Sequence, residues 1–103
     1  MKRRLSGRNA ESSPRPGGLL RSLRKQRGFT LRDVHVASIR LARRFKQPAF
    51  QIPPSRLHEI EVKEVVPSVY RMYTLACVYR CSIRKLLSWY NIPPVLRRSS
   101  RSR

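Results

Sequence analysis

Four side chains in this sequence could bind zinc, because cysteine and histidine are its preferred protein ligands. They are His35, His58, Cys77 and Cys81. Structural zinc sites usually have a close ligand pair at each end of the motif, and only the cysteines are that close. The sequence therefore predicts no metal site and no cofactor. Both thiols are expected to be reduced, because two cysteines four residues apart on one helix are poorly placed for a disulfide.

Glu61 is the residue that could serve as a general base. No nucleophile, metal-ligand set or phosphate-binding loop accompanies it in the sequence. In addition, a chain of 103 residues supports one domain with a modest core, which argues against an enzyme built from two domains. The sequence is therefore predicted not to be an enzyme.

Guanidinium is the most abundant charged group in the chain. There are 19 Arg and 5 Lys against 5 acidic residues, which gives a formal net charge of +19. Planar guanidinium groups pair well with phosphate oxygens, so this composition predicts a polyanionic partner. Codon bias in a GC-rich genome is an alternative origin for part of the arginine excess.

The positive charge is spread over three segments. Residues 1–17 carry +4 and are rich in Ser, Pro and Gly, and residues 93–103 begin with two prolines and also carry +4. These two segments are predicted to be disordered basic arms. Residues 18–92 hold 15 basic and 4 acidic residues, a balance of +11, so the predicted folded domain is itself basic.

Apolar runs in the sequence are short. None approaches the roughly 20 residues that a membrane-spanning helix needs, which predicts that the chain does not contact a membrane. The basic N-terminus is not followed by an apolar segment, so no secretory signal is predicted and the expected location is the cytoplasm.

Within residues 18–92 the apolar residues recur every three to four positions, which predicts an all-α fold of five short helices. The first helix contains the leucines at 19, 20 and 23 and ends at Gly28. The second begins at Thr30, whose spacing from Asp33 is that of a capping box, and ends before Pro48.

The remaining three helices follow at short intervals. The third starts after Pro53-Pro54 and buries Leu57 and Ile60, with Ile52 entering the core just ahead of it. The fourth starts near Pro67-Ser68, and the fifth is capped by Ser82 and terminated by Pro93. The predicted apolar face of the fourth helix is Val69, Met72, Tyr73, Ala76 and Tyr79, and that of the fifth is Ile83, Leu86, Leu87 and Tyr90, with Trp89 beside it.

The order and spacing of these residues resemble a known type of domain. Leu57-x-x-Ile60-Glu61 is followed six residues after the glutamate by Pro67-Ser68, and Leu20, Leu23 and Gly28 precede it at matching intervals. This pattern is similar to the Xre or phage-repressor type of helix-turn-helix DNA-binding domain. The resemblance implies a five-helix repressor-like fold in which the third helix enters the major groove and Glu61 has a structural role.

The sequence departs from that family between its second and third helices. Val34 and Ile52 are 18 positions apart, roughly a dozen more than the tight turn of the family provides. Apolar residues continue through this segment at helical spacing. We therefore expect the second helix to extend by about two to three turns, and residues 47–51 to lead the chain back to Ile52.

The resemblance also implies which residues contact DNA. The start of the third helix would present Pro54, Ser55 and Glu59 to base edges, with Arg56 and His58 flanking them. Arg56 can pair with guanine, Glu59 can accept from cytosine, and Pro54 can contact only a thymine methyl group. Thr30, Arg32 and Lys63 would hold backbone phosphates.

Two groups of residues have more than one interpretation. Arg40, Arg43, Arg44 and Lys46 on the extended second helix are either a phosphate-contacting strip or a solvated helix face. Tyr70, Tyr73, Tyr79 and Trp89 could stack on single-stranded bases, but their helical spacing favours core packing or a dimer face.

The function predicted from these observations is that of a sequence-specific DNA-binding transcriptional regulator. It would bind double-stranded DNA as a homodimer, and no small-molecule effector domain is evident. Two alternatives remain: an antitoxin-type regulator of a toxin–antitoxin pair, and a non-specific basic protein associated with RNA or the ribosome.

Overall fold

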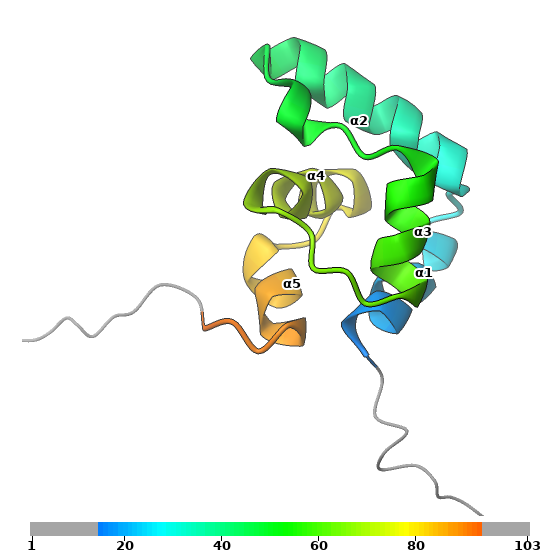
Figure 1. The fold of residues 1–103 in the computed structure, drawn as a ribbon, viewed down its shortest axis with the longest axis vertical. Coiled ribbons are helices and arrows are strands. Elements are labelled where there is room, and N and C mark those ends of the chain that lie inside the picture. The colour runs from blue at the N-terminus through cyan, green and yellow to red at the C-terminus, as the bar shows by residue number, and fades with distance from the viewer. Residues whose placement is uncertain (1–14, 94–103) are drawn as a thin grey trace, which may run out of the picture.

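Helices account for all the regular secondary structure of residues 15–93, the part of the chain that our computed structural model describes (Figure 1). This confirms the predicted all-α class and the number of helices. In chain order the elements are α1 (Pro16–Gln26), α2 (Leu31–Phe45), the short 3-10 helix η1 (Pro48–Phe50), α3 (Pro54–Val62), α4 (Val69–Tyr79) and α5 (Ile83–Trp89).

Side-chain caps define where three of the five α-helices begin. The Thr30 hydroxyl accepts a hydrogen bond from the Asp33 amide at 3.0 Å, and the Asp33 carboxylate accepts one from the Thr30 amide at 2.8 Å. This reciprocal pair is the predicted capping box. Ser68 and Ser82 cap α4 and α5 by a single hydrogen bond each. In both cases the serine hydroxyl accepts from the backbone amide three residues later. Gly28 takes the predicted left-handed conformation after α1, with φ of 79°.

Both ends of the domain differ slightly from expectation. α1 begins at Pro16, ahead of the expected boundary at residue 18, because proline is accommodated in the first turn of a helix. α5 ends at Trp89 before it reaches Pro93. Most of the two predicted arms, residues 1–14 and 94–103, lies outside the described residues.

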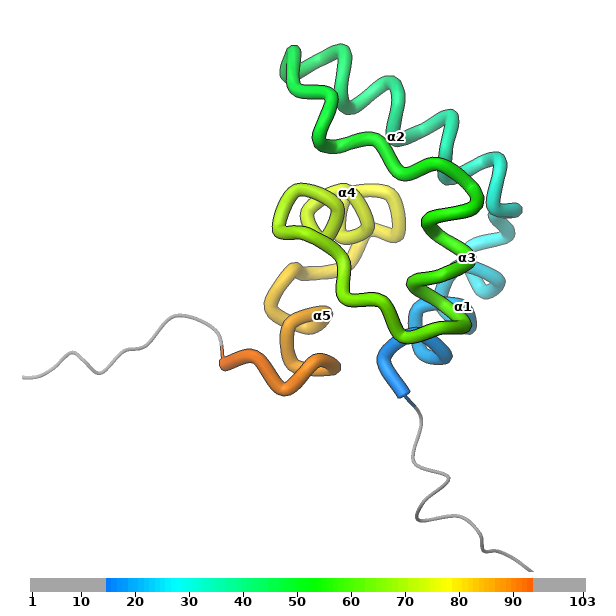
Figure 2. Tube along the Cα trace, in the orientation of Figure 1, coloured from blue at the N-terminus to red at the C-terminus, as the bar shows by residue number. Residues whose placement is uncertain are grey.

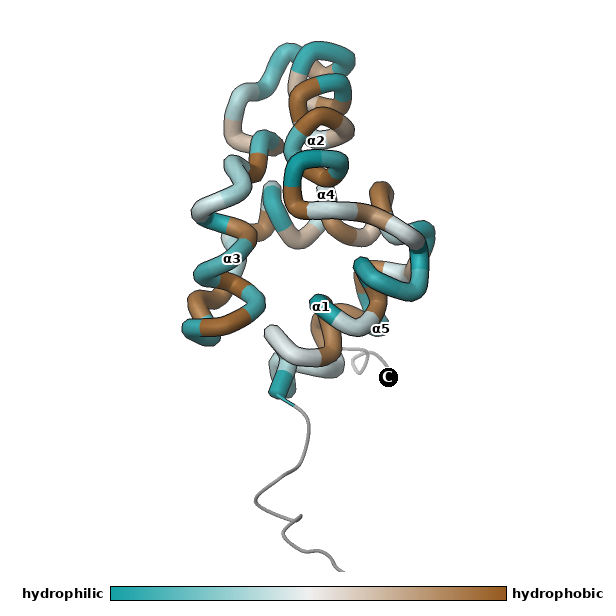
Figure 3. The backbone as a smooth tube through the Cα atoms, turned by 90° about the vertical axis from the view of Figure 1, so that its right-hand side faces the viewer, coloured by the Kyte–Doolittle hydropathy of each residue, from teal (hydrophilic) through white to brown (hydrophobic). Residues whose placement is uncertain are grey.

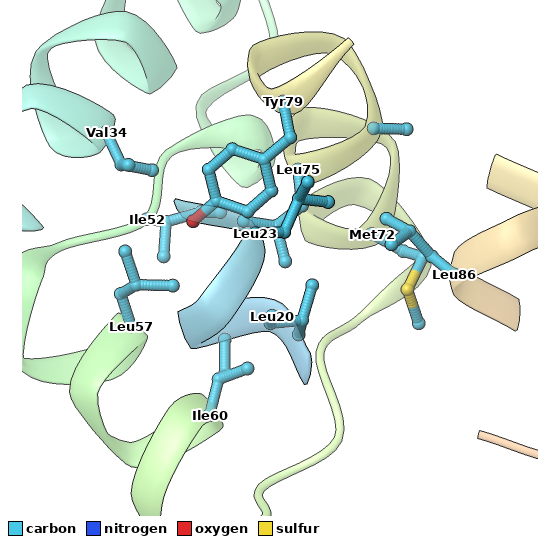
Figure 4. Close-up of a cluster of buried hydrophobic side chains, with 11 residues drawn as sticks. Leu20, Leu23, Val34, Ile52, Leu57, Ile60, Met72, Leu75, Tyr79 and Leu86 are labelled. Carbon is cyan, nitrogen blue, oxygen red and sulfur yellow. The ribbon is translucent and has the colours of Figure 1, made fainter. Parts of the chain in front are cut away.

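One apolar core receives side chains from all five α-helices (Figure 4). Its fully enclosed members agree closely with the predicted set, including Leu20 from α1, Val34 from α2, Leu57 and Ile60 from α3, and Leu86 from α5. Ile52, which precedes α3, is also fully buried, as expected. The prediction that apolar side chains at 3.6-residue spacing form a single core is confirmed.

The predicted buried face of α4 is partly wrong. Val69 is 71% exposed and Tyr73 is 40% exposed, whereas Leu75, which was not assigned to the core, is fully buried. The predicted set combined two stripes of the helix, and only the one that contains Met72, Ala76 and Tyr79 faces the core. Sequence spacing alone could not choose between the stripes, because apolar residues lie on both. Likewise only Leu86 is fully buried on α5, with its other predicted apolar residues partly covered.

The segment inserted between Val34 and Ile52 folds as a helical hairpin. α2 continues to Phe45, Lys46 turns the chain in the left-handed conformation with φ of 53°, and η1 leads it back alongside α2 (Figure 2). The Ile52 amide then donates a hydrogen bond to the Ser38 hydroxyl at 2.9 Å. Since Ser38 is one turn beyond Val34, the chain returns to the point at which a tight turn would start α3. The predicted extension of α2 and the returning segment are therefore confirmed.

Candidate nucleic-acid interface

α3 has one face in the core and an opposite face that meets solvent. Leu57, Ile60 and Glu61 are buried on the inner face. On the outer side Ser55, Arg56 and His58 are exposed, and Pro54 and Glu59 are half-buried. The structure thus brings all five α3 residues proposed for base contact onto the accessible part of one helix.

Arg56 and Glu59 form an ion pair on that outer face. The Arg56 Nη1 and Glu59 Oε1 atoms are 2.9 Å apart, and about two-fifths of each side chain is exposed. Their spacing of three residues places them on adjacent turns of α3. Arg56, the strongest hydrogen-bond donor among the residues proposed for base contact, is therefore held beside Glu59, which can only accept hydrogen bonds. The two side chains thus act as one unit.

A buried ion pair fixes α3 against α1. Arg24 donates from Nε to Glu61 Oε2 at 2.7 Å and from Nη2 to Glu61 Oε1 at 3.0 Å. Its Nη1 donates to the Phe29 carbonyl oxygen at 2.9 Å. The hydrogen bonds to Glu61 raise the pKa of the Arg24 guanidinium. This two-point pairing sets the angle at which α3 leaves the core.

Glu61 accordingly has the structural position that the family resemblance implied. Arg24 was missed in the sequence, although a signal was present. It lies four residues after Leu20, and so one turn along the buried stripe of α1, where an unpaired cation would be costly.

The start of α2 carries two of the proposed phosphate contacts. Thr30 and Arg32 are both exposed. The capping box uses the Thr30 and Asp33 amides, which leaves the Leu31 and Arg32 amides without a helical partner. Hydrogen bonds from the Thr30 amide and then from its hydroxyl lower the pKa of the Asp33 carboxyl. Lys63, the third proposed contact, is exposed at the end of α3.

Most of the basic residues in the described chain have no acidic partner. Residues 15–93 contain 16 basic and 4 acidic residues. Only Arg24 and Arg56 form ion pairs within this range. The resulting field is positive and weakly compensated, which favours polyanions over neutral or basic surfaces.

The four basic residues of the inserted segment are all exposed. Arg40, Arg43, Arg44 and Lys46 lie on the second half of α2 and at its C-terminal cap. Arg43 and Lys46 also line an open pocket of about 290 Å³, together with Ala42, Gln47, Pro48 and Gln51.

Metal ligands, thiols and the lengths of apolar helices are further features of residues 15–93 that bear on function. No three His, Cys, Asp or Glu side chains between residues 15 and 93 come together as a metal site. Cys77 and Cys81 are both free thiols, and burial raises the pKa of Cys81. No helix in this range is long and apolar enough to cross a bilayer.

Comparison of this chain with protein-family models, with curated proteins and with solved structures yields no match. The assignment to the Xre or phage-repressor type therefore remains a prediction from the residues themselves.

Proposed function

We propose that this protein is a sequence-specific DNA-binding transcriptional regulator that places α3 in the major groove of double-stranded DNA. The observation that carries this proposal is the two-sided construction of α3. Its inner face is locked to the core by Leu57, Ile60 and the Arg24–Glu61 pair, and its outer face presents polar side chains on a strongly basic body.

The dimensions of α3 support this role. An α-helix such as α3 is about 10–12 Å across with its side chains. The major groove is about 12 Å wide and accepts an α-helix together with its side chains. Because both ends of α3 are fixed by neighbouring contacts, its outer face reaches a groove as a rigid element.

The residues then take distinct roles. Ser55 and the Arg56–Glu59 pair read base edges, with Arg56 donating to guanine and Glu59 accepting from cytosine. Pro54 offers an apolar contact and His58 flanks this set. Thr30, Arg32 and Lys63 position the domain by contacting phosphates, which contributes affinity without sequence discrimination.

Selection of bound sequences from a random DNA duplex pool tests the proposal directly. We expect an enriched motif, and a palindromic one, because a homodimer presents two α3 helices related by a two-fold axis. Equal affinity for the enriched duplex and a scrambled duplex throughout a salt titration would exclude sequence-specific regulation. Crosslinking in cells that recovers RNA almost exclusively would instead support the alternative of an RNA-associated protein.

Substitution of Arg56 tests whether this residue provides the preference for one DNA sequence over another. Arg56→Ala is expected to weaken binding to the selected duplex by about 1–3 kcal/mol while changing binding to scrambled DNA much less. Arg84→Ala, which removes an exposed cation from α5 instead, is the matched control. Fluorescence anisotropy with both duplexes measures the difference. A loss of the same size in the two variants would contradict base reading by Arg56.

A further inference from the structure

The outer side of α4 is apolar and aromatic rather than charged. Val69 is 71% exposed, Tyr70 is 42% exposed and Tyr73 is 40% exposed, and Cys77 lies exposed one turn beyond Tyr73. Tyr70, Tyr73 and Cys77 follow one another at spacings of three and four, and Val69 lies four residues before Tyr73, so these residues form a continuous stripe along the helix. The core covers the other side of α4, so this stripe is a second apolar side that stays largely exposed.

The inserted hairpin enlarges this stripe with two phenylalanines. The Phe50 ring centroid lies 5.4 Å from that of Tyr70 and 5.6 Å from that of Tyr73, and the Phe45 centroid lies 6.4 Å from that of Tyr73. Phe45 is itself 48% exposed. We call these four rings together with Val69 the aromatic surface.

Hydrogen bonds from α4 hold the hairpin in place beneath the rings. The Thr74 hydroxyl donates to the Phe50 carbonyl oxygen at 2.7 Å, and Arg71 Nε donates to the Gln51 carbonyl oxygen at 2.8 Å. The rings therefore stand on backbone that is already ordered. A ligand that covers a preformed surface loses little affinity to ordering it, and exposed Tyr, Phe and Arg side chains are typical of binding hot spots.

Charge around the aromatic surface selects the kind of partner. The Arg44 guanidinium lies 5.8 Å from the Phe45 ring centroid, and Lys46 and Arg43 are its exposed neighbours. All four acidic residues between 15 and 93 lie elsewhere, in the first turn of α2, on α3 or just after α3. A second copy of this chain would bring two cationic rims together, whereas an acidic partner would neutralise them.

We propose that the aromatic surface is a docking site for an acidic protein segment whose aromatic or aliphatic side chains cover the four rings. The hairpin that separates this sequence from the compact helix-turn-helix pattern is thus a binding element in its own right. This inference does not depend on the DNA-binding role of α3, because it rests on residues of α2, η1 and α4.

Peptide binding tests the proposal with the full chain. The probe is a fluorescein-labelled peptide of about 12 residues in which Glu and Asp alternate with Trp and Leu, compared with a peptide of equal charge that has Ser and Gly in the apolar positions. In about 0.15 M salt, where distant charges are screened, we expect the apolar acidic peptide to bind at least about tenfold more tightly.

Variants of the aromatic surface locate this preference. Phe45→Ser combined with Tyr73→Ser is expected to abolish the preference for the apolar acidic peptide. Weak binding of the Ser/Gly peptide of equal charge should stay unchanged. Ile92→Ser, at a residue that is 39% exposed after α5, is the matched control and should keep it. If circular dichroism shows that the double variant is unfolded, Val69→Ser is used instead, since its highly exposed side chain contributes little to the core. An about threefold loss of preference is then expected.

Three outcomes would overturn the proposal. The first is equal affinity of the wild-type protein for the two peptides. The second is a dimer in sedimentation experiments that Phe45→Ser with Tyr73→Ser converts to a monomer, which would assign the surface to a second copy. The third is binding of single-stranded oligothymidylate that competes with the apolar peptide and is lost in the same variant, which would assign the rings to base stacking.

Discussion

Arg24 and Glu61 place two full charges in the interior of a small protein. Both residues are more than nine-tenths buried, and their removal from water is unfavourable. Two parallel hydrogen bonds, with a third from Arg24 to the Phe29 carbonyl, satisfy the guanidinium on three sides. The pair therefore contributes chiefly to the unique docking of α3 on α1, and its loss should be felt at the proposed interface.

Breaking one side of this pair should be costly. Glu61→Ala leaves the Arg24 guanidinium buried without its counter-ion, and we expect a loss of about 3–5 kcal/mol in the free energy of unfolding. Urea denaturation followed by circular dichroism measures it. The double substitution Arg24→Met with Glu61→Leu removes both charges and should recover most of that loss. A double variant no more stable than Glu61→Ala would contradict this assignment of the penalty to the unpaired charge.

Tyr79 differs from the paired Arg24 and Glu61, because its buried hydroxyl group has no hydrogen-bond partner among the described residues. Its side chain is fully buried and points from α4 into the core, and its hydroxyl makes no hydrogen bond in the structure (Figure 4). Burial raises the pKa of Tyr79 well above its usual value, and burial raises the pKa of Tyr90 to about 12.

Removal of the Tyr79 hydroxyl should therefore be tolerated. Tyr79→Phe is expected to leave stability unchanged or to increase it by about 1 kcal/mol, because an unsatisfied polar atom is replaced by a carbon-bound hydrogen. Urea denaturation at neutral pH measures the change. A loss above about 1 kcal/mol would show that the hydroxyl is satisfied by a bound water.

The same substitution should also change the alkaline limit of stability. Above pH 10 the unfolded chain loses the Tyr79 proton while the folded protein keeps it, so the folded protein binds more protons and becomes less stable as pH rises. Tyr79→Phe should reduce this decline, and the remaining part should come from other groups whose pKa is raised in the folded protein, namely Tyr90, Tyr73 and Cys81.

At the scale of elements, the contact between α1 and α3 depends on a glycine. A Cβ atom at Gly17 would lie 2.5 Å from the carbonyl oxygens of Ile60 and Glu61. The Gly17 amide also donates to Glu64 Oε1 at 3.1 Å, so a carboxylate faces the first turn of α1. The start of α1 and the end of α3 are therefore in backbone contact.

Two adjacent glycines allow a matched test of this contact. Gly17→Ala should destabilise the protein by about 1–3 kcal/mol, because neither carbonyl can move without shifting α3. Gly18→Ala is the control, since a Cβ there meets nothing within 4 Å and alanine favours the helix by up to about 1 kcal/mol. Thermal melting of the two variants should shift in opposite directions. Equal shifts would mean that α1 is not closely packed on α3.

α2 shows how one element serves two surfaces. Hydrophobic and hydrophilic residues alternate along α2 (Figure 3). Val34, Ser38 and Ala42 are buried, whereas its arginines are exposed. α2 contacts α3, α4 and η1, and Phe45 at its C-terminal end packs against Tyr73 of α4. The insertion therefore adds a surface that contacts α4.

For the whole molecule, the distribution of charge leads to a prediction about salt. Arg43 and Arg44 are exposed on the inserted hairpin, and neither forms an ion pair with a described residue. If both contact phosphates, Arg43→Ala with Arg44→Ala should weaken binding to every duplex and reduce the slope of log K against log salt by up to about two units. Titration of DNA binding against salt measures the slope. An unchanged slope would show that the hairpin faces away from DNA.

Much of this architecture could be predicted from local signals in the sequence. Thr30 with Asp33, Ser82, Gly28 and Pro48 mark helix ends through contacts within a few residues, and the structure confirms them, whereas α5 ends before Pro93. The periodic apolar residues correctly identified Leu20 and Leu23 of α1, Val34 of α2, and Leu57 and Ile60 of α3 as core, whereas Phe45 at the end of α2 is 48% exposed. On α4, where apolar residues surround the helix, the same argument failed for Val69 and Tyr73.

The sequence by itself determined that this protein is a basic, all-helical domain with five helices at nearly their observed positions, because caps, helix breakers and apolar period act over a few neighbouring residues. The tertiary structure decided which stripe of α4 is buried, that Arg24 pairs with Glu61, and that Ile52 returns to Ser38. Each of these contacts joins residues that are more than ten positions apart. Their energies depend on the geometry of the assembled core, and local pattern contains no information on that geometry.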